Sequence, residues 1–315
     1  MRAWAPYLLA LAVALAFPQV FRSNFAVNFG VLVLFAAFIG QSWNIAGGFA
    51  GQLSFGHAVF FGSGAYASTL VQLKLGLSPW LGLSAALATG AAVGALVAIL
   101  SFRAGLRGSY FALITLAFAE VFRIIANSVE WTGAGLGLLI PRNPGLANFQ
   151  FAERVGFYYV ILAFTVVSIA VAFWLTRSRF GARLAAIREN EDAARALGID
   201  IFREKVKVMM LSGALCGAGG TFYAQYFLYI DPSIAYGVDK SVEMLLVSMI
   251  SGQGTVWGPL VGALLLGVVG EVTRAMTDAP GLSLIIYGGL LILTIAFLPD
   301  GLTQLFRSRK RAAKP

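Results

Sequence analysis

The stretch AIRENEDAARALGID (residues 186–200) is crowded with acidic and basic side chains, in a chain otherwise rich in Leu, Val, Ala, Phe and Gly. On both sides of it, apolar runs of about 17–25 residues recur, each long enough to cross a bilayer as a helix. A charged segment between such runs is typical of a water-exposed connection between membrane helices. The stretch therefore predicts a membrane protein with one substantial cytoplasmic loop.

The composition agrees with this interpretation. The chain has 315 residues, of which 59% are hydrophobic and 12% are charged, far from the balance of a soluble domain. We predict an all-α fold, a polytopic transmembrane helix bundle that forms a single domain over residues 1–315. One cysteine and one histidine provide no disulfide framework and no metal-binding cluster, so we expect no metal.

The number of membrane crossings follows from the apolar runs and the charges between them. The run 240–274 is too long for one straight crossing and is interrupted by SGQGTVWGP (251–259), so we expect it to cross twice. Ten membrane segments result. They lie at 6–21, 26–46, 54–73, 80–102, 109–127, 156–175, 206–230, twice within 240–274, and at 282–298.

Basic residues set the predicted orientation. Most of the 23 Lys and Arg fall in the loop 177–205, in the tail 303–315 and in short loops on the same side. By the positive-inside rule, that side and both termini are cytoplasmic. The net charge of +9 is explained by these loops, so we expect no nucleic-acid partner.

Two glycine-rich stretches interrupt the predicted helices: GGFAGQLSFGHAVFFGSGAYAS (47–68) and SGQGTVWGP (251–259). One interpretation is close helix packing, because Ser54, Ala58 and Gly62 repeat every four residues. The other is a broken helix that lines a translocation path, and the two are compatible. The candidate path residues, with two membrane acids included, are Gly51, Gln52, Ser54, Gly56, His57, Glu120, Glu243, Gly254 and Thr255.

The two acids need partners or water at membrane depth. Glu120 lies one helical turn before Arg123, which favours a structural ion pair. Glu243 is closer to an unpaired acid of the kind used in proton relays.

The charged stretch itself reads as a short helix. Asn190 can cap it, Arg195 can pair with Glu191 at i+4, and Gly198 can end it. Ala193, Ala194 and Leu197 would form a small apolar face ringed by charge. That face could dock in a groove of another protein, or the helix could be a solvated connector.

Four motifs in order resemble the permease family of branched-chain amino acid ABC transporters, of the LivM type. The resemblance runs from about residue 30 to residue 302. Its cytoplasmic loop has a Glu-Ala-Ala pattern followed by Gly, present here with one extra residue as Glu191, Asp192, Ala193, Ala194 and Gly198. Ser251 and Gln253 depart from the family pattern. The motifs are GQLSFGHAVFFGSGAY (51–66), GSYFALITLAFAEVFR (108–123), SRFGARLAAIRENEDAARALGID (178–200) and GTVWGPLVGALLL (254–266).

The resemblance implies one permease subunit of an importer in the bacterial inner membrane, moving branched-chain or related amino acids. It implies a second permease subunit, two cytoplasmic ATPase subunits and a periplasmic or lipid-anchored substrate-binding protein as partners, besides membrane lipid. The sequence has no phosphate-binding loop, so we expect ATP on the partners, no cofactor on this chain and no catalytic residues. The residues implied to couple to the ATPase are Arg188, Glu191, Asp192, Ala193, Ala194, Arg195, Leu197 and Gly198.

Similar permeases also serve urea, short amides and carboxylates, so the cargo stays open. Two other classes of membrane protein fit the sequence less well. A secondary transporter would use Glu120 or Glu243 to couple to ions or protons, but would leave the charged helix without a task. A membrane-embedded enzyme has little chemistry available in this composition.

Overall fold

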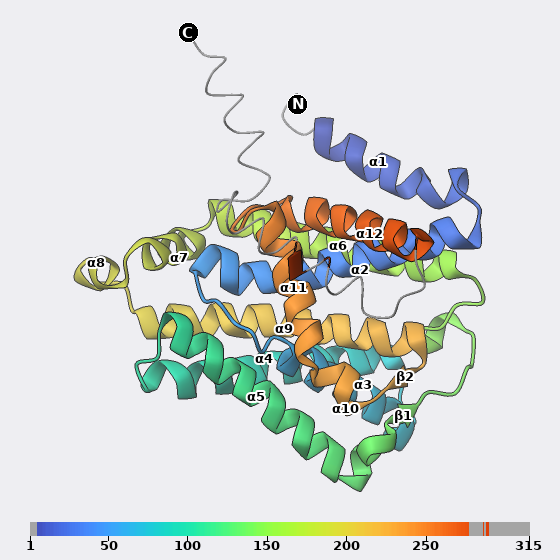
Figure 1. Cartoon of the computed structure of the whole chain (residues 1–315), viewed down its shortest axis with the longest axis horizontal. Helices are drawn as coiled ribbons and strands as arrows, with labels where there is room; N and C mark the ends of the chain where they lie inside the picture. Colours follow the sequence, from blue (N-terminus) through green and yellow to red (C-terminus); the bar gives the residue numbers. More distant parts are fainter. Residues whose placement is uncertain (1–4, 277–285, 287, 290–315) are drawn as a thin grey trace.

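The computed structural model describes residues 5–276, 286, 288 and 289, with side chains from residue 11 to 273 and at the last three. Almost every element is a helix, and the long helices run roughly along the long axis of the molecule (Figure 1). The longer helices are α1 (Ala5–Val20), α2 (Asn24–Asn44), α3 (Ala58–Leu75), α4 (Pro79–Arg103), α5 (Gly108–Ser128), α6 (Arg154–Arg177), α7 (Arg179–Glu189), α9 (Ile201–Phe227), α11 (Val238–Ser251) and α12 (Gly258–Met276). The shorter elements are α8 (Glu191–Ala196), α10 (Pro232–Tyr236), a π-helix η1 (Ile45–Phe49), and the 3-10 turns η2 (Glu130–Thr132), η3 (Ala134–Leu136) and η4 (Leu146–Asn148).

The all-α prediction holds except for one minimal strand pair. Strand β1 (Leu138–Leu139) pairs antiparallel with β2 (Tyr229–Ile230), with Leu138 opposite Ile230. This pair lies at the opposite end of the molecule from α7 and α8 (Figure 1). It fixes the α5–α6 connection to the end of α9.

The predicted interruption of 240–274 is confirmed. Helix α11 ends at Ser251, and Gly252 follows with a φ of 116°, a conformation that glycine adopts without strain. Helix α12 then starts at Gly258. The interruption of the other glycine-rich stretch lies further along than predicted, because α3 begins only at Ala58 and not at residue 54.

Length and apolar content qualify four of the described helical stretches as membrane spans: Asn24–Phe49, Pro79–Arg103, Gly108–Ser128 and Arg154–Arg177. The ten predicted crossings therefore stay a prediction. Apart from residues 286, 288 and 289, the last predicted span, 282–298, lies outside the described residues. The basic tail 303–315 lies outside them entirely.

Glycine lets α3, α4 and α9 approach backbone to backbone. A Cβ atom placed on Gly213 of α9 would lie 2.3 Å from the carbonyl oxygen of Gly90 in α4. One placed on Gly64 of α3 would lie 2.3 Å from the Cα of Gly217 in α9. Any side chain at these positions would push the helices apart.

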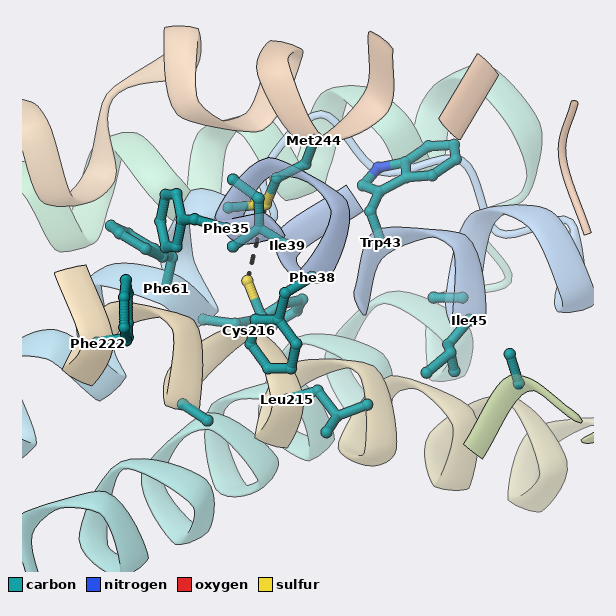
Figure 2. Close-up of a cluster of buried hydrophobic side chains, with 14 of the residues drawn as sticks. Phe35, Phe38, Ile39, Trp43, Ile45, Phe61, Leu215, Cys216, Phe222 and Met244 are labelled. Carbon is teal, nitrogen blue, oxygen red and sulfur yellow. Dashed lines mark hydrogen bonds between the residues drawn. The ribbon is translucent and has the colours of Figure 1, made fainter. Parts of the chain in front are cut away.

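A second group of helices, α2, α11 and α12, packs in a similar way. Cβ atoms placed on Gly40 of α2 and on Gly262 of α12 would lie 2.4 Å and 2.0 Å from atoms of Val247 in α11. Between the two groups lies an aromatic core, in which Phe35 and Phe38 of α2 lie near Phe222 of α9 (Figure 2). The single cysteine is part of this core.

Candidate coupling and translocation site

Helix α8 has the ends that the sequence predicts. The Asn190 side-chain oxygen accepts hydrogen bonds from the backbone N–H groups of Asp192 and Ala193, both at 3.0 Å. Gly198 ends the helical segment with a φ of 81° and open space around its Cα, so its glycine is required for backbone conformation alone. The predicted cap and stop are confirmed.

The predicted apolar face of α8 is wrong in one residue. Ala194 points inward and is buried with Ile187 of α7 and Ile201 of α9. Ala193 and Leu197 point outward, and Leu197 is 80% exposed. The sequence pattern did not separate these sides because α8 has only six residues, too few to show which side the neighbouring helices cover.

The predicted pairing of Arg195 with Glu191 is also wrong. Arg195 pairs with Asp192 at 3.2 Å, whereas Glu191 pairs with Lys205 and with Arg107 of the α4–α5 connection. The Lys205 side chain is almost fully buried, so it needs the carboxylate more than the exposed Arg195 does. Lys205 precedes the predicted span 206–230. Burial lowers its pKa, and its hydrogen bond to Glu191 acts in the opposite direction.

Arg188 reaches the two glycine-rich stretches, although its side chain stays partly exposed and also pairs with Glu189. It lies at the end of α7, and its Nη1 atom donates a hydrogen bond to the carbonyl oxygen of Gly48 at 2.9 Å. Its side chain also lies against Gly51 and Gly254, where added Cβ atoms would come within 2.8 Å and 2.6 Å of Arg188 atoms. Arg188 therefore contacts both glycine-rich stretches at once.

The regular α-helical hydrogen bonding of α2 is lost in two steps along the first glycine-rich stretch. Helix α2 loosens into the π-helix η1, and residues 51–57 are then irregular. Trp43 Nε1 donates a hydrogen bond to the Ser54 carbonyl at 2.8 Å, and the side-chain Nε2 of Gln52 donates one to the Ala50 carbonyl at 2.8 Å. Backbone groups freed by the break thus find partners inside the protein.

Gly56 and His57 hold the end of this stretch in the bundle. A Cβ atom on Gly56 would lie 1.8 Å from the Thr115 carbonyl oxygen of α5. His57 is completely buried, and its Nε2 lies 2.9 Å from the Ser212 hydroxyl of α9. Both residues therefore pack against neighbouring helices.

Asn44, which the sequence analysis missed, joins the two glycine-rich stretches. Its Nδ2 donates to the Thr255 carbonyl at 2.9 Å, and its Oδ1 accepts from the Gly254 N–H at 2.8 Å. Asn44 is fully buried. An amide just before a glycine pair at the end of an apolar run was the signal that could have pointed to it.

The two predicted membrane acids lie apart from these breaks. Glu120 pairs with Arg123 at 2.5 Å on α5, which confirms the predicted structural pair. Glu243 is not an unpaired acid, because Lys240 pairs with it at 2.7 Å on α11, which corrects the sequence interpretation. Lys240 lies one turn before Glu243, so the spacing that identified the Glu120 pair could also have identified this one.

Comparisons with known proteins identify a family and several relatives of this chain. A family model described as "Branched-chain amino acid transport system / permease component" matches residues 21–295. The high-affinity branched-chain amino acid transport system permease protein LivM of Escherichia coli is 30% identical, over 95% of this chain and 74% of that protein. The L-arabinose ABC transporter permease protein AraH of Azospirillum brasilense is 29% identical, over 80% of this chain and 71% of that protein.

A nucleoside ABC transporter permease protein, NupC of Lactococcus lactis, is 29% identical over 44% of each chain. Among solved structures, none matches.

Proposed function

Because the chain belongs to the family of branched-chain amino acid transport system permease components, an ABC importer permease family of integral membrane proteins, we propose that it moves branched-chain or related amino acids across the bacterial inner membrane. The match to LivM over most of both chains supports this cargo ahead of the arabinose and nucleosides named for other relatives. Separate subunits would bind and hydrolyse ATP, and this chain would hold no cofactor of its own.

The observation that carries the proposal is the contact of Arg188 with both glycine-rich stretches. On its outer side, the loop 177–205 presents Leu197 and Ala193 of α8 to water, where an ATPase groove could receive them. Arg188, just before α8, donates a hydrogen bond to the Gly48 carbonyl and lies against Gly51 and Gly254. A push on α8 therefore has a direct route to both breaks.

The remaining contacts make the loop stiff enough for this role. Glu191 is held by Lys205 and Arg107, and Arg183 pairs with Glu204 of α9 at 3.0 Å. These pairs attach α7 and α8 to α9, and α8 to the α4–α5 connection. A rigid connector transmits displacement, whereas a flexible one would absorb it.

The proposed partners are those of such importers: a second permease subunit, two cytoplasmic ATPase subunits and a periplasmic or lipid-anchored binding protein. The termini and the loop 177–205 would be cytoplasmic. Labelling of an introduced Ala196→Cys from outside intact cells, in a Cys216→Ala background, would contradict that orientation, and Gly145→Cys should label instead.

The secondary-transporter alternative has less support from the described residues. Each of its two candidate acids already has a basic partner one helical turn away. A proton-coupling acid needs to exchange its proton with water during transport, whereas both of these carboxylates are engaged by a basic side chain.

The test is to co-express the chain with its neighbouring transport subunits and purify the complex through a tag on the permease. We expect ATPase subunits to co-purify, and leucine-loaded binding protein to stimulate both ATP hydrolysis and leucine uptake in proteoliposomes. A variant ATPase that binds but does not hydrolyse ATP is the control. Uptake that persists with this variant and collapses with a proton ionophore would contradict the proposal and favour a secondary transporter.

A further inference from the structure

A cavity of about 400 Å³ lies between α2, α9, α11 and α12, away from the coupling loop. Its volume falls in the range of small-molecule sites. Most of its lining is apolar, but three charged residues, Lys240, Glu243 and Glu271, belong to it as well, and Lys240 and Glu243 form an ion pair. The apolar part includes Val33, Ala36, Leu246, Ala263 and Leu266.

Aromatic rings hold the Lys240 ammonium in place. Its Nζ atom lies 5.3 Å from the Tyr223 ring centroid and 5.8 Å from the centroids of Phe35 and Phe61, distances at which a cation is attracted to a ring face. The Lys240 side chain is 17% exposed and that of Glu243 is 37% exposed. Both charged side chains line the cavity, and the carboxylate is the more exposed of the two.

The position of this pair argues against a purely structural role. Both residues lie on α11, three positions apart, so their contact does not join one helix to another. Charges at membrane depth are expensive and commonly serve a transported solute or ion. The contact between Lys240 and Glu243 itself joins no helices, and both charges line the cavity, where a zwitterionic ligand can use them.

We propose that this cavity is a transient site for an amino acid with an apolar side chain, an inference that rests on the proposed function and assigns its substrate a site within the bundle. The ligand's carboxylate would bind Lys240 Nζ, and its ammonium would bind Glu243. Each protein charge exchanges one partner for another, so the zwitterion enters without leaving a charge unpaired. The apolar lining would receive the side chain.

The site is also placed to communicate with the coupling loop. Helix α11 carries Lys240 near its start and ends at Ser251, just before the Gly254 region that Arg188 contacts. The helix has 14 residues, which spans roughly 20 Å. Because an α-helix moves as a rigid element, a displacement of α11 near Lys240 also displaces its end at Ser251.

The test uses the complete complex in proteoliposomes, with Ala36→Cys introduced into the cavity lining in a Cys216→Ala background. Maleimide labelling of Cys at position 36 is measured with leucine and with three probes: 4-methylpentanoate, which lacks the ammonium, isoamylamine, which lacks the carboxylate, and arabinose, which has neither. We expect leucine to slow labelling, each one-charge analogue to need at least tenfold more, and arabinose to have no effect at the same concentration.

The charge pair is then replaced by Lys240→Met with Glu243→Gln, which removes both charges and leaves neither unpaired. We expect this double variant to assemble and to keep ATP hydrolysis stimulated by loaded binding protein. Leucine protection should weaken at least tenfold, and leucine uptake per ATP should fall. The control is Asp239→Asn, which removes an exposed charge from the next position on α11, and it should behave like the parent.

Two results would overturn the inference. One is equal protection by leucine and arabinose. The other is parental protection and parental uptake per ATP in the double variant. Both leave ATP-driven leucine import intact, so they are distinguishable from failure of the proposed function, in which loaded binding protein stimulates neither hydrolysis nor uptake.

Discussion

The Arg188 guanidinium of α7 and the Gly48 carbonyl oxygen of η1 are joined by a 2.9 Å hydrogen bond across 140 residues of sequence. The acceptor is a backbone group in a helix that has already loosened from α to π geometry. π-Helical turns often mark functional positions, because their hydrogen bonds are easily rearranged. The bond therefore links the charged loop to a deformable part of the bundle.

Replacing Arg188 with methionine should uncouple ATP hydrolysis from uptake. Methionine keeps an apolar stem beside Gly51 but loses the donor to Gly48. Hydrogen bonds from charged groups contribute about 1.5–3 kcal/mol, so we expect at least a tenfold fall in leucine transported per ATP. Stimulated hydrolysis and uptake would be measured together in proteoliposomes.

Arg195→Met is the matched control for this change, because Arg195 is exposed and pairs only locally with Asp192 among the described contacts. Exposed pairs of this kind contribute about 0–1 kcal/mol. Parental coupling in Arg188→Met would mean that the contact with Gly48 transmits nothing.

The two central alanines of α8 should respond differently to enlargement. Ala193→Trp adds bulk to the exposed side, so we expect the ATPase subunits to be lost during purification while the loop stays folded. Ala194→Trp overfills the contact with Ile187 and Ile201, which typically costs about 1–3 kcal/mol, and should loosen the loop itself. Limited proteolysis within 177–205 and ATPase co-purification separate the two effects. Full ATPase retention by Ala193→Trp would leave α8 as a solvated connector.

Even the smallest side chain at Gly56 should destabilise the bundle. An added Cβ would lie 1.8 Å from the Thr115 carbonyl oxygen, a backbone atom that moves only with α5. We expect Gly56→Ala to lower the melting temperature in detergent by several degrees and to reduce transport. A Cβ added at Gly145 would lie 3.6 Å from the Asn148 side chain, an ordinary contact distance, so Gly145→Ala is the control. Equal melting temperatures would show that close approach at Gly56 is not needed.

The sequence predicted the structure best at residues whose type has one characteristic local effect on the backbone, such as capping or ending a helix. Asn190 and Gly198 predicted the ends of α8, and Gly252 and Pro259 predicted the break between α11 and α12, because capping and helix breaking are local events. The sequence did not indicate which glycines meet across helices, as Gly90 and Gly213 do.

Features that depend on three-dimensional proximity were missed. Arg188 was predicted only as one of the residues that couple to the ATPase, yet its position at the end of α7 turns it toward Gly48. Glu191 pairs with Lys205 and not with Arg195, because the fold brings Lys205 of α9 next to Glu191. No spacing within residues 186–200 contains that information.

The backbone contacts among α3, α4 and α9 have a mechanical consequence. Where glycine meets glycine, there are no rotamers to rearrange, so these three helices can move only as one block. The α2, α11 and α12 group is tied to itself through Val247, and it meets the block through side chains, as where Gly219 faces Ile39. The two groups of helices can slide past each other at this side-chain contact. The Lys240 cavity lies at the same contact, with Tyr223 on one side and Phe35 on the other. Sliding would therefore widen or close the cavity without disrupting the packing within either group.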